Sequence, residues 1–408
     1  MDCNDAANTP STSDRPAIPD EAEMSPVAGL KADCILNSCG EKPDIAALVH
    51  FATSTDGLVN DEVRRKVWPL LLGYMPYEKT ESTKSATWHG LPRHKDEDQV
   101  RLDVDRSFIY YPKNQSEPQL DRRKKELSAV ITQVLREQPI LSYFQGFHDI
   151  AQVFLLVLGV DDAPAAVSQL SLLRIRDFML PSLEPSIAHL HLLPSILEAE
   201  CPKLRLHLSQ TQPFFALAAT LTLYAHDIQE YSDIARLFDF FLAHGAVVSV
   251  YFFAIIILSR RQELFEIPAD EPEMLHSVLS KLPKPLDLEA LIAHTVSLYQ
   301  KFPPEQLPFR AWAMISQYSV LKTTRTTGDF RQQTLIDGAA YFDLQVAQLR
   351  RQEMRRKAMA TLWKHRRSAG RVGLAVLVGA VAIWLGKGGV ESYAAMVLRR
   401  LWEKSRVY

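Results

Sequence analysis

Arg106 and Gln145 are the residues of this sequence whose types and settings could assist a chemical step. The stretch RLDVDRSFIYY places Asp103 three residues before Arg106, and on a helix these two side chains lie on one face. The stretch YFQG places Gln145 directly before Gly146. An arginine offers a planar, permanently charged fork of donors that suits a phosphoryl group in transit, and a glutamine carboxamide can align an attacking water. From these residues alone, two interpretations stay open: the parts that an activator supplies to a GTPase, or a surface ion pair and a helix-capping glutamine.

Other catalytic or ligand-binding patterns are missing from the sequence. It contains no G-x-x-x-x-G-K-[ST], no G-x-G-x-x-G and no G-x-S-x-G motif. HKDED (94–98) has no second histidine or cysteine at a metal-ligand spacing, so we expect a solvated helix start and no metal site. His148 with Asp149, and His226 with Asp227, are adjacent pairs whose side chains point to different faces of a helix, so neither is a ready-made dyad. Intrinsic catalysis therefore has little support, and we expect the chain to hold no cofactor of its own.

The composition is typical of a globular protein with a substantial core. Of 408 residues, 47% are hydrophobic and 23% are charged, and the net charge of −2 gives no reason to expect nucleic-acid binding. The four cysteines form no C-x-x-C pair, and no apolar signal opens the chain, so we expect thiols in a reducing compartment and a domain in the cytosol. Residues 1–40 are expected to be a disordered tail, because their first part is rich in Ser, Thr, Pro and Asp and lacks aromatics.

Residues 41–310 predict an all-α domain, because apolar residues recur every three to four positions and no clean strand alternation occurs. The segment NDEVRRKVWPLLLGY, for example, begins with Asn60 or Asp61 as its N-cap and places its apolar residues on one face. GAVVSVYFFAIIILS (245–259) is as apolar as a membrane span, but helices of the same array flank it. We therefore expect it to be a buried core helix.

The C-terminal part has a different character. Residues 311–371 are expected to be a linker followed by a basic amphipathic helix, with nine Lys or Arg against one acidic residue between 350 and 371. Residues 372–387 follow as a predicted transmembrane anchor, because fifteen uncharged residues adjoin a cationic flank that favours the cytosolic side. A hydrophobic packing helix is the alternative to the anchor, and a partner-binding helix is the alternative to the lipid-facing basic flank. Residues 388–408 would be a short tail whose side of the membrane stays open.

Four motifs in their order resemble those of TBC-domain Rab GTPase-activating proteins over about residues 41–310. VRLDVDRS resembles the family's I-x-x-D-x-x-R motif, with Val100 in place of Ile, and YFQG resembles its Y-x-Q motif. EVRRKVWPLLLG is similar to the R-x-x-x-W-x-x-L element, and RLFDFFL is similar to the R-[IL]-[WF]-D-x-[FL]-[FL] element. PRHKDEDQVRLDVDRS, RDFMLPSLE and KFPPEQL further resemble a subgroup of the family that carries a C-terminal membrane segment.

The resemblance implies roles for individual residues. Arg106 would be an arginine finger that reaches the phosphates of GTP bound to a Rab, and Gln145 would be a glutamine finger that places the hydrolytic water. Asp103 would orient Arg106, and Tyr143 would pack the loop of Gln145 with support from Gly146. His148 and Asp149 are candidates for lining the same groove. The resemblance further makes Trp68, Arg236 and Asp239 structural, as a buried aromatic and an ion pair within the fold.

The resemblance also implies a partner and a place in the cell. The chain would be no enzyme by itself but an activator that completes the active site of a GTP-bound Rab, with GTP and Mg²⁺ held by the Rab. It would act on the Rab-one/Ypt-one class in ER-to-Golgi transport, anchored in the endoplasmic reticulum membrane with its domain facing the cytosol. A non-catalytic, membrane-anchored Rab effector or tether on the same fold is the alternative. An unrelated helical scaffold would leave the four ordered motifs unexplained.

Overall fold

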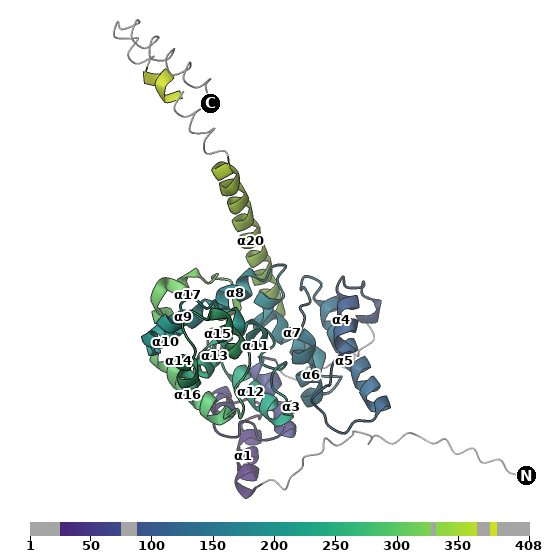
Figure 1. The fold of residues 1–408 in the computed structure, drawn as a ribbon. Coiled ribbons are helices and arrows are strands. Elements are labelled where there is room, and N and C mark those ends of the chain that lie inside the picture. Colours follow the sequence, from purple (N-terminus) through teal and green to yellow (C-terminus); the bar gives the residue numbers. More distant parts are fainter. Residues whose placement is uncertain (1–24, 75–87, 327, 329–331, 365–375, 382–408) are drawn as a thin grey trace, which may run out of the picture. The chain divides into compact units, whose positions relative to one another are not determined.

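The computed structural model of the chain describes residues 25–74, 88–326, 328, 332–364 and 376–381. These residues form helices and loops, with no strand among them (Figure 1). The chain divides into two compact units, residues 1–345 and residues 346–408. The predicted all-α fold is confirmed for the described part.

The first half of the first unit carries the candidate site. Its helices are α1 (Pro26–Asn37), α2 (Ile45–Thr53), α3 (Asp61–Leu71), η3 (Trp88–Gly90), α4 (Glu97–Val104), α5 (Glu117–Glu137), α6 (Phe147–Leu158), α7 (Ala163–Leu173) and η4 (Arg176–Phe178). Helices α4, α5 and α6 pack against one another, at one end of the unit in Figure 1.

The second half is a cluster of helices around a buried centre. They are α8 (Glu184–Leu190), α9 (Leu192–Glu200), α10 (Pro202–His207), η5 (Pro213–Ala216), α11 (Leu217–Leu221), α12 (Tyr231–Ala243), α13 (Val248–Ser259), α14 (Arg261–Glu266), α15 (Pro272–Leu279), α16 (Leu288–Lys301), η6 (Pro304–Gln306), η7 (Pro308–Arg310), α17 (Ala311–Met314) and α18 (Val320–Thr323). The long helix α20 (Leu335–Lys364) begins in this unit and continues into the second. At the centre lies α13, whose residues from Val248 to Ile257 are all buried and which packs against α9 and α16. The prediction of a core helix at 245–259 is confirmed.

Helix α3 is tied to α12 by a buried carboxylate. Asn60 caps α3 as predicted, since its side chain accepts a hydrogen bond from the Val63 amide at 3.0 Å. Trp68 is fully buried and donates from its indole nitrogen to Oδ1 of Asp239 at 2.8 Å. Arg64 pairs with the same carboxylate at 3.0 Å. Because a buried carboxylate needs donors on every side, these bonds fix the two helices in one register.

The structural role predicted for Arg236 holds, but with another partner. Arg236 and Asp239 do not pair with each other: the guanidinium of Arg236 bonds to Glu289 on α16 at 2.6 Å and to the carbonyl oxygen of Ala52 at 2.9 Å. The two residues lie three apart on α12, but their partners lie on different elements. Long-range packing, and not helical spacing, decides the pairing.

The predicted N-terminal tail is too long. Residues 1–24 lie outside the described residues, but Pro26–Asn37 forms α1, with the Ser25 hydroxyl accepting from the Ala28 amide at 3.2 Å. Ala32 and Ile35 are buried, and α1 contacts α2 and α3. The predicted tail includes this segment, yet contacts with later helices bury its apolar residues.

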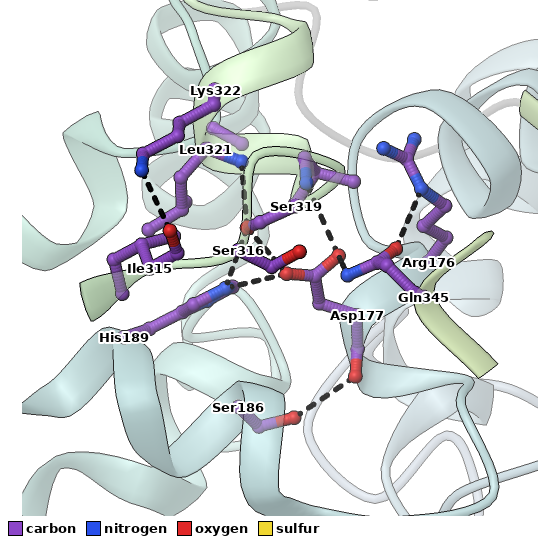
Figure 2. Close-up of polar contacts among 12 residues, drawn as sticks. Arg176, Asp177, Ser186, His189, Ile315, Ser316, Ser319, Leu321, Lys322 and Gln345 are labelled. Atoms are coloured by element: carbon purple, nitrogen blue, oxygen red, sulfur yellow. Dashed lines mark hydrogen bonds and ion pairs between the residues drawn. The ribbon is translucent and has the colours of Figure 1, made fainter. Parts of the chain in front are cut away.

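The boundary predicted at residue 310 is also wrong, because the first unit extends to Gln345, with Val320 and Phe342 among its buried residues. Figure 2 shows the polar contacts that hold them. Gln345 accepts from Nε of Arg176 at 3.0 Å and donates to Oδ1 of Asp177 at 3.0 Å, and the Val320 amide donates to the same oxygen at 3.1 Å. Gln345 and Ser319 are buried. The polar sequence around 322–334 resembles a linker, but the segments before and after it both form hydrogen bonds with the buried Asp177 carboxylate.

The second unit contains the rest of α20, where the residues from Arg350 to Thr361 are all exposed. The predicted basic helix is therefore present in its described part, as the C-terminal portion of α20, which begins at Leu335. Most of the predicted anchor at 372–387 lies outside the described residues. Its described part, 376–381, is helical. In the part of the chain that the structure describes, no helix has the length and apolar character needed to cross a membrane.

Candidate functional site

Asp103 is the centre of the site. It lies in the last turn of α4, where it is 1% exposed and packs on the same buried side as Val100 and Val104. Its Oδ1 accepts hydrogen bonds from Nη2 of Arg106 at 2.9 Å and from Nε2 of Gln99 at 3.0 Å. Its Oδ2 accepts from the Tyr143 hydroxyl at 2.9 Å. One buried carboxylate thereby connects the arginine of one loop to the aromatic of another.

Arg106 extends from this carboxylate into solvent. The residue lies in the turn after α4, where its amide donates to the Asp103 carbonyl oxygen at 3.1 Å. Its side chain is 66% exposed, although one nitrogen is held by Asp103. A guanidinium has five N–H donors, so most of the fork remains available to an incoming anion. The predicted pairing of Asp103 with Arg106 is present, and its direction is fixed by a buried partner.

The loop that carries Gln145 is attached to the same frame. The Tyr143 amide donates to Oδ2 of Asp96 at 2.9 Å, and the Ser142 amide donates to the Met179 carbonyl oxygen at 2.8 Å. The Tyr143 ring packs edge-on against Phe147, with ring centres 6.1 Å apart. Gln145 is exposed between two buried residues, and its carboxamide makes no hydrogen bond within the described residues. The carboxamide is therefore free to bind a water or a partner.

Gly146 is the residue that allows this loop to enter α6. It precedes the helix with φ +104, a backbone angle that residues with a side chain rarely adopt. A Cβ at this position would lie 2.5 Å from Cγ2 of Thr222, well inside van der Waals contact. The supporting role predicted for Gly146 thus has a double physical basis, in backbone angle and in space.

His148 and Asp149 both lie close to Asp103 and Tyr143, and Asp149 connects onward to His226. The Tyr143 hydroxyl is 3.1 Å from Nδ1 of His148, and Nε2 of His148 is 3.4 Å from Asp149. Asp149 bonds in turn to Nδ1 of His226 at 3.0 Å. His148 and Asp149 do approach each other, although their adjacency on a helix predicts different faces, and a shorter contact forms across elements between Asp149 and His226. The sequence analysis considers His226 only as the neighbour of Asp227 and does not predict its contact with Asp149, which spans 77 positions.

The electrostatics of the cluster keep its members in defined protonation states. Burial and the neighbouring Asp103 carboxylate raise the pKa of the Tyr143 hydroxyl, which therefore stays a donor. Burial lowers the pKa of His148, so this imidazole is neutral near pH 7. The hydrogen bond to Asp149 raises the pKa of His226, whose side chain is 64% exposed. The exposed edge of the site is thus cationic through Arg106 and, as the pH falls, through His226.

The HKDED segment begins α4 as predicted, but it is not merely solvated, because it also holds the site together. His94 is buried, with Nε2 3.0 Å from the Leu141 carbonyl oxygen. Glu97 pairs with Arg136 of α5 at 2.8 Å. Together with Asp96, which accepts from the Tyr143 amide, these residues attach the glutamine loop to α4 and α5. Among the described residues no group of histidine, cysteine and acidic side chains could hold a metal ion.

A second constellation in the fold has the residue types of a hydrolytic triad but lacks its geometry. His189 points the same nitrogen, Nε2, at Asp177 (2.8 Å) and at the Ser319 hydroxyl (3.3 Å), and all three side chains are buried (Figure 2). A triad needs the two imidazole nitrogens to serve different partners. Burial alone would raise the pKa of Asp177, but the hydrogen bond and charge of His189 lower it to about 2. We therefore assign these residues a structural role, which is to attach the segment around Ser319 to the rest of the first unit.

Comparisons with known proteins show which family the chain resembles. Residues 61–265 match the family model described as the Rab-GTPase-TBC domain. The chain is 34% identical to TBC1 domain family member 20 of Homo sapiens over 365 residues, which cover 87% of this chain and 88% of that protein. It is 32% identical to GTPase-activating protein gyp10 of Schizosaccharomyces pombe over 315 residues, covering 76% and 82% of the two chains. These relatives confirm the resemblance, including the subgroup indicated by the stretches around 92–107, 176–184 and 301–307.

Solved structures share the fold. The crystal structure of the Ypt/Rab-GAP domain of Gyp1p superposes with a TM-score of 0.53 over 67% of this chain and 99% of that one, at 14% sequence identity. A Chlamydomonas flagellar RabGAP TBC domain gives a TM-score of 0.50 at 13% identity, over 66% and 92% of the two chains. From the family match, the curated relatives and the shared helical fold, we conclude that this chain belongs to the TBC-domain family of Rab GTPase-activating proteins.

Proposed function

We propose that this chain accelerates GTP hydrolysis by a Rab by supplying two catalytic groups in trans. Arg106 is the arginine finger that neutralises charge on the transferring phosphoryl group, and Gln145 is the glutamine finger that aligns the attacking water. GTP and Mg²⁺ are held by the Rab. Asp103 and Tyr143 position the two fingers and do not touch the nucleotide.

One observation carries the proposal: two exposed side chains of the right chemistry, Arg106 and Gln145, lie on segments that one buried carboxylate joins. Asp103 accepts from Arg106 and from Tyr143, and Tyr143 lies two residues before Gln145. Preorganised groups cost little reorganisation when the transition state forms, which is why their placement matters for rate. A surface ion pair with a helix-capping glutamine would not require this arrangement, and Gln145 caps nothing, since Gly146 precedes α6.

We further propose that the chain works at a membrane of the early secretory pathway. The substrate would be a Rab of the Rab-one/Ypt-one class, and residues 372–387 would anchor the chain in the endoplasmic reticulum with the domain facing the cytosol. The support is the resemblance to a subgroup with a C-terminal membrane segment, and the fifteen uncharged residues that follow nine cationic ones. The exposed, cation-rich part of α20 would lie near anionic lipid headgroups.

The experiment that tests the function is hydrolysis by a panel of Mg²⁺·GTP-loaded Rabs in the presence of the full chain. We expect acceleration of one or a few Rabs, and a loss of about 10³-fold or more in that acceleration for Arg106→Ala. Arg101→Ala is the matched control, because Arg101 is exposed on α4, just before the turn that carries Arg106, and makes no ion pair within the described residues. Equal losses in the two variants would contradict the finger assignment.

A non-catalytic effector or tether is the second candidate function. In that case the wild-type chain would bind a GTP-loaded Rab and leave the Rab's intrinsic hydrolysis rate unchanged. The exposure of Arg106 and Gln145 together favours the catalytic function, because an effector has no need for either side chain to be held free.

A further inference from the structure

The loop that follows Arg106 alternates between buried and exposed residues in an unusual way. Phe108 is 7% exposed and Tyr111 is 3% exposed, whereas Ile109 and Tyr110 between them are 74% and 40% exposed. A single exposed apolar residue needs no explanation. Two adjacent ones, held between buried anchors, need one.

The anchors come from α6, the same helix that begins at the glutamine loop. Gln152 is 4% exposed, and its Oε1 accepts from the Phe108 amide at 2.9 Å while its Nε2 donates to the Tyr111 carbonyl oxygen at 3.4 Å. The Tyr111 hydroxyl donates to the Ala225 carbonyl oxygen at 3.3 Å. The loop is therefore closed on both sides of its exposed pair by buried polar contacts.

The backbone of the loop is strained to achieve this. Phe108 has φ +61, which is uncommon for a residue with a bulky side chain. Left-handed residues of this kind persist only where the surroundings fix them, and they gather at functional sites. Here the strained residue turns the chain so that Ile109 and Tyr110 are solvent-exposed three and four residues after Arg106.

We propose that Ile109 and Tyr110 form a preformed apolar contact for the GTP-bound Rab, beside the point where Arg106 enters its active site. The inference rests on the proposed function for the identity of the partner. A finger that reaches a bound nucleotide brings the residues next to it against the surface of the GTPase around that nucleotide. Gln152 is the positioning residue, since it fixes this loop to α6, and Gly146 fixes the glutamine loop to the start of the same helix.

The contact sets affinity, while the fingers set the rate. Tyrosine is among the residue types that dominate interface energetics, and burial of the Ile109 side chain on binding adds apolar area, whereas polar rim contacts contribute little. The exposed pair would thus keep the Rab bound while Arg106 and Gln145 act. Because the loop is already fixed, little ordering cost opposes the contact.

The test is the dissociation constant for a Rab loaded with a non-hydrolysable GTP analogue, measured with the full chain. The Rab is the one that binds most tightly in the panel. Ile109→Ser should weaken binding about tenfold or more, and Tyr110→Ser should act in the same direction. Leu206→Ser is the matched control, because Leu206 is 67% exposed on α10, and it should bind like the wild type.

The readout separates this inference from the proposed catalytic function. Binding does not require hydrolysis. A chain that binds a Rab but does not accelerate hydrolysis would therefore refute the catalytic roles of Arg106 and Gln145, and the binding role of Ile109 and Tyr110 could still be tested. An Ile109→Ser variant that binds as tightly as the Leu206→Ser control would overturn the inference, and so would a wild-type chain that binds no Rab. Unchanged thermal unfolding midpoints would show that the exposed substitutions leave the fold intact.

Discussion

Replacing Gly146 by alanine should displace the glutamine finger, and the size of the effect follows from two separate penalties. The first is the backbone: φ +104 lies beyond the left-handed region that alanine tolerates, at a cost of about 1–2 kcal/mol. The second is overpacking, since the new Cβ would lie 2.5 Å from Cγ2 of Thr222, which costs about 1–3 kcal/mol in a packed site. We expect Gly146→Ala to lose about 2–5 kcal/mol in free energy of unfolding.

A second substitution separates the two penalties. Thr222→Ser removes Cγ2 but keeps the hydroxyl, which donates to the Ala218 carbonyl oxygen at 3.0 Å. In the double variant with Gly146→Ala, the clash with Cγ2 is gone, so the stability lost to overpacking should be recovered. The two substitutions should therefore couple by about 1–3 kcal/mol. The backbone part should remain.

The assay is denaturant-induced unfolding of the wild type, both single variants and the double variant, with stimulated GTP hydrolysis measured in parallel. Hydrolysis should fall for Gly146→Ala, because Gln145 directly precedes the displaced backbone, and should recover in part in the double variant. If Gly146→Ala unfolded at the wild-type denaturant concentration, or if Thr222→Ser restored nothing, the reasoning about this position would be refuted.

Three further perturbations test other parts of the structure. Asp103→Asn keeps the shape of the side chain but removes the charge that holds Arg106, so stimulated hydrolysis should fall about 100-fold in a single-turnover assay. Trp68→Phe removes a donor from the buried Asp239 carboxylate, and denaturant unfolding should show a loss of about 1–3 kcal/mol. Burial lowers the pKa of His244 from 6.5 to about 4. The unfolded chain therefore binds the proton first as the pH falls, and stability should drop by about 3 kcal/mol between neutral pH and pH 4, a slope that His244→Gln should reduce.

The residues most readily predicted from the sequence are those whose partners lie within a helical turn. Asp103 and Arg106 are three apart, and the structure pairs them at 2.9 Å. The apolar period of α3 and the cap of Asn60 are equally local, as is the long apolar run that becomes α13. Local spacing suffices in these places because the partner is fixed by helix geometry.

The residues that could not be predicted have partners far along the chain. Gln152 reaches back 44 positions to the Phe108 amide, and His226 meets Asp149 across 77 positions. Neither contact has a sequence signal, since both depend on how α6 packs. The end of the first unit is predicted wrongly for the same reason. Gln345 is buried where it forms hydrogen bonds with Arg176 and Asp177, which lie 169 and 168 positions away in the sequence.

The measurement that tests the central claim most directly uses a Rab whose own catalytic glutamine is replaced by leucine. If this chain supplies the water-aligning glutamine, the wild type should accelerate single-turnover hydrolysis by that Rab, whereas Gln145→Ala should not. Gln210→Ala, which changes an exposed glutamine outside the site, should behave like the wild type. Acceleration that depends on the Rab's own glutamine and is indifferent to Gln145 would contradict the account.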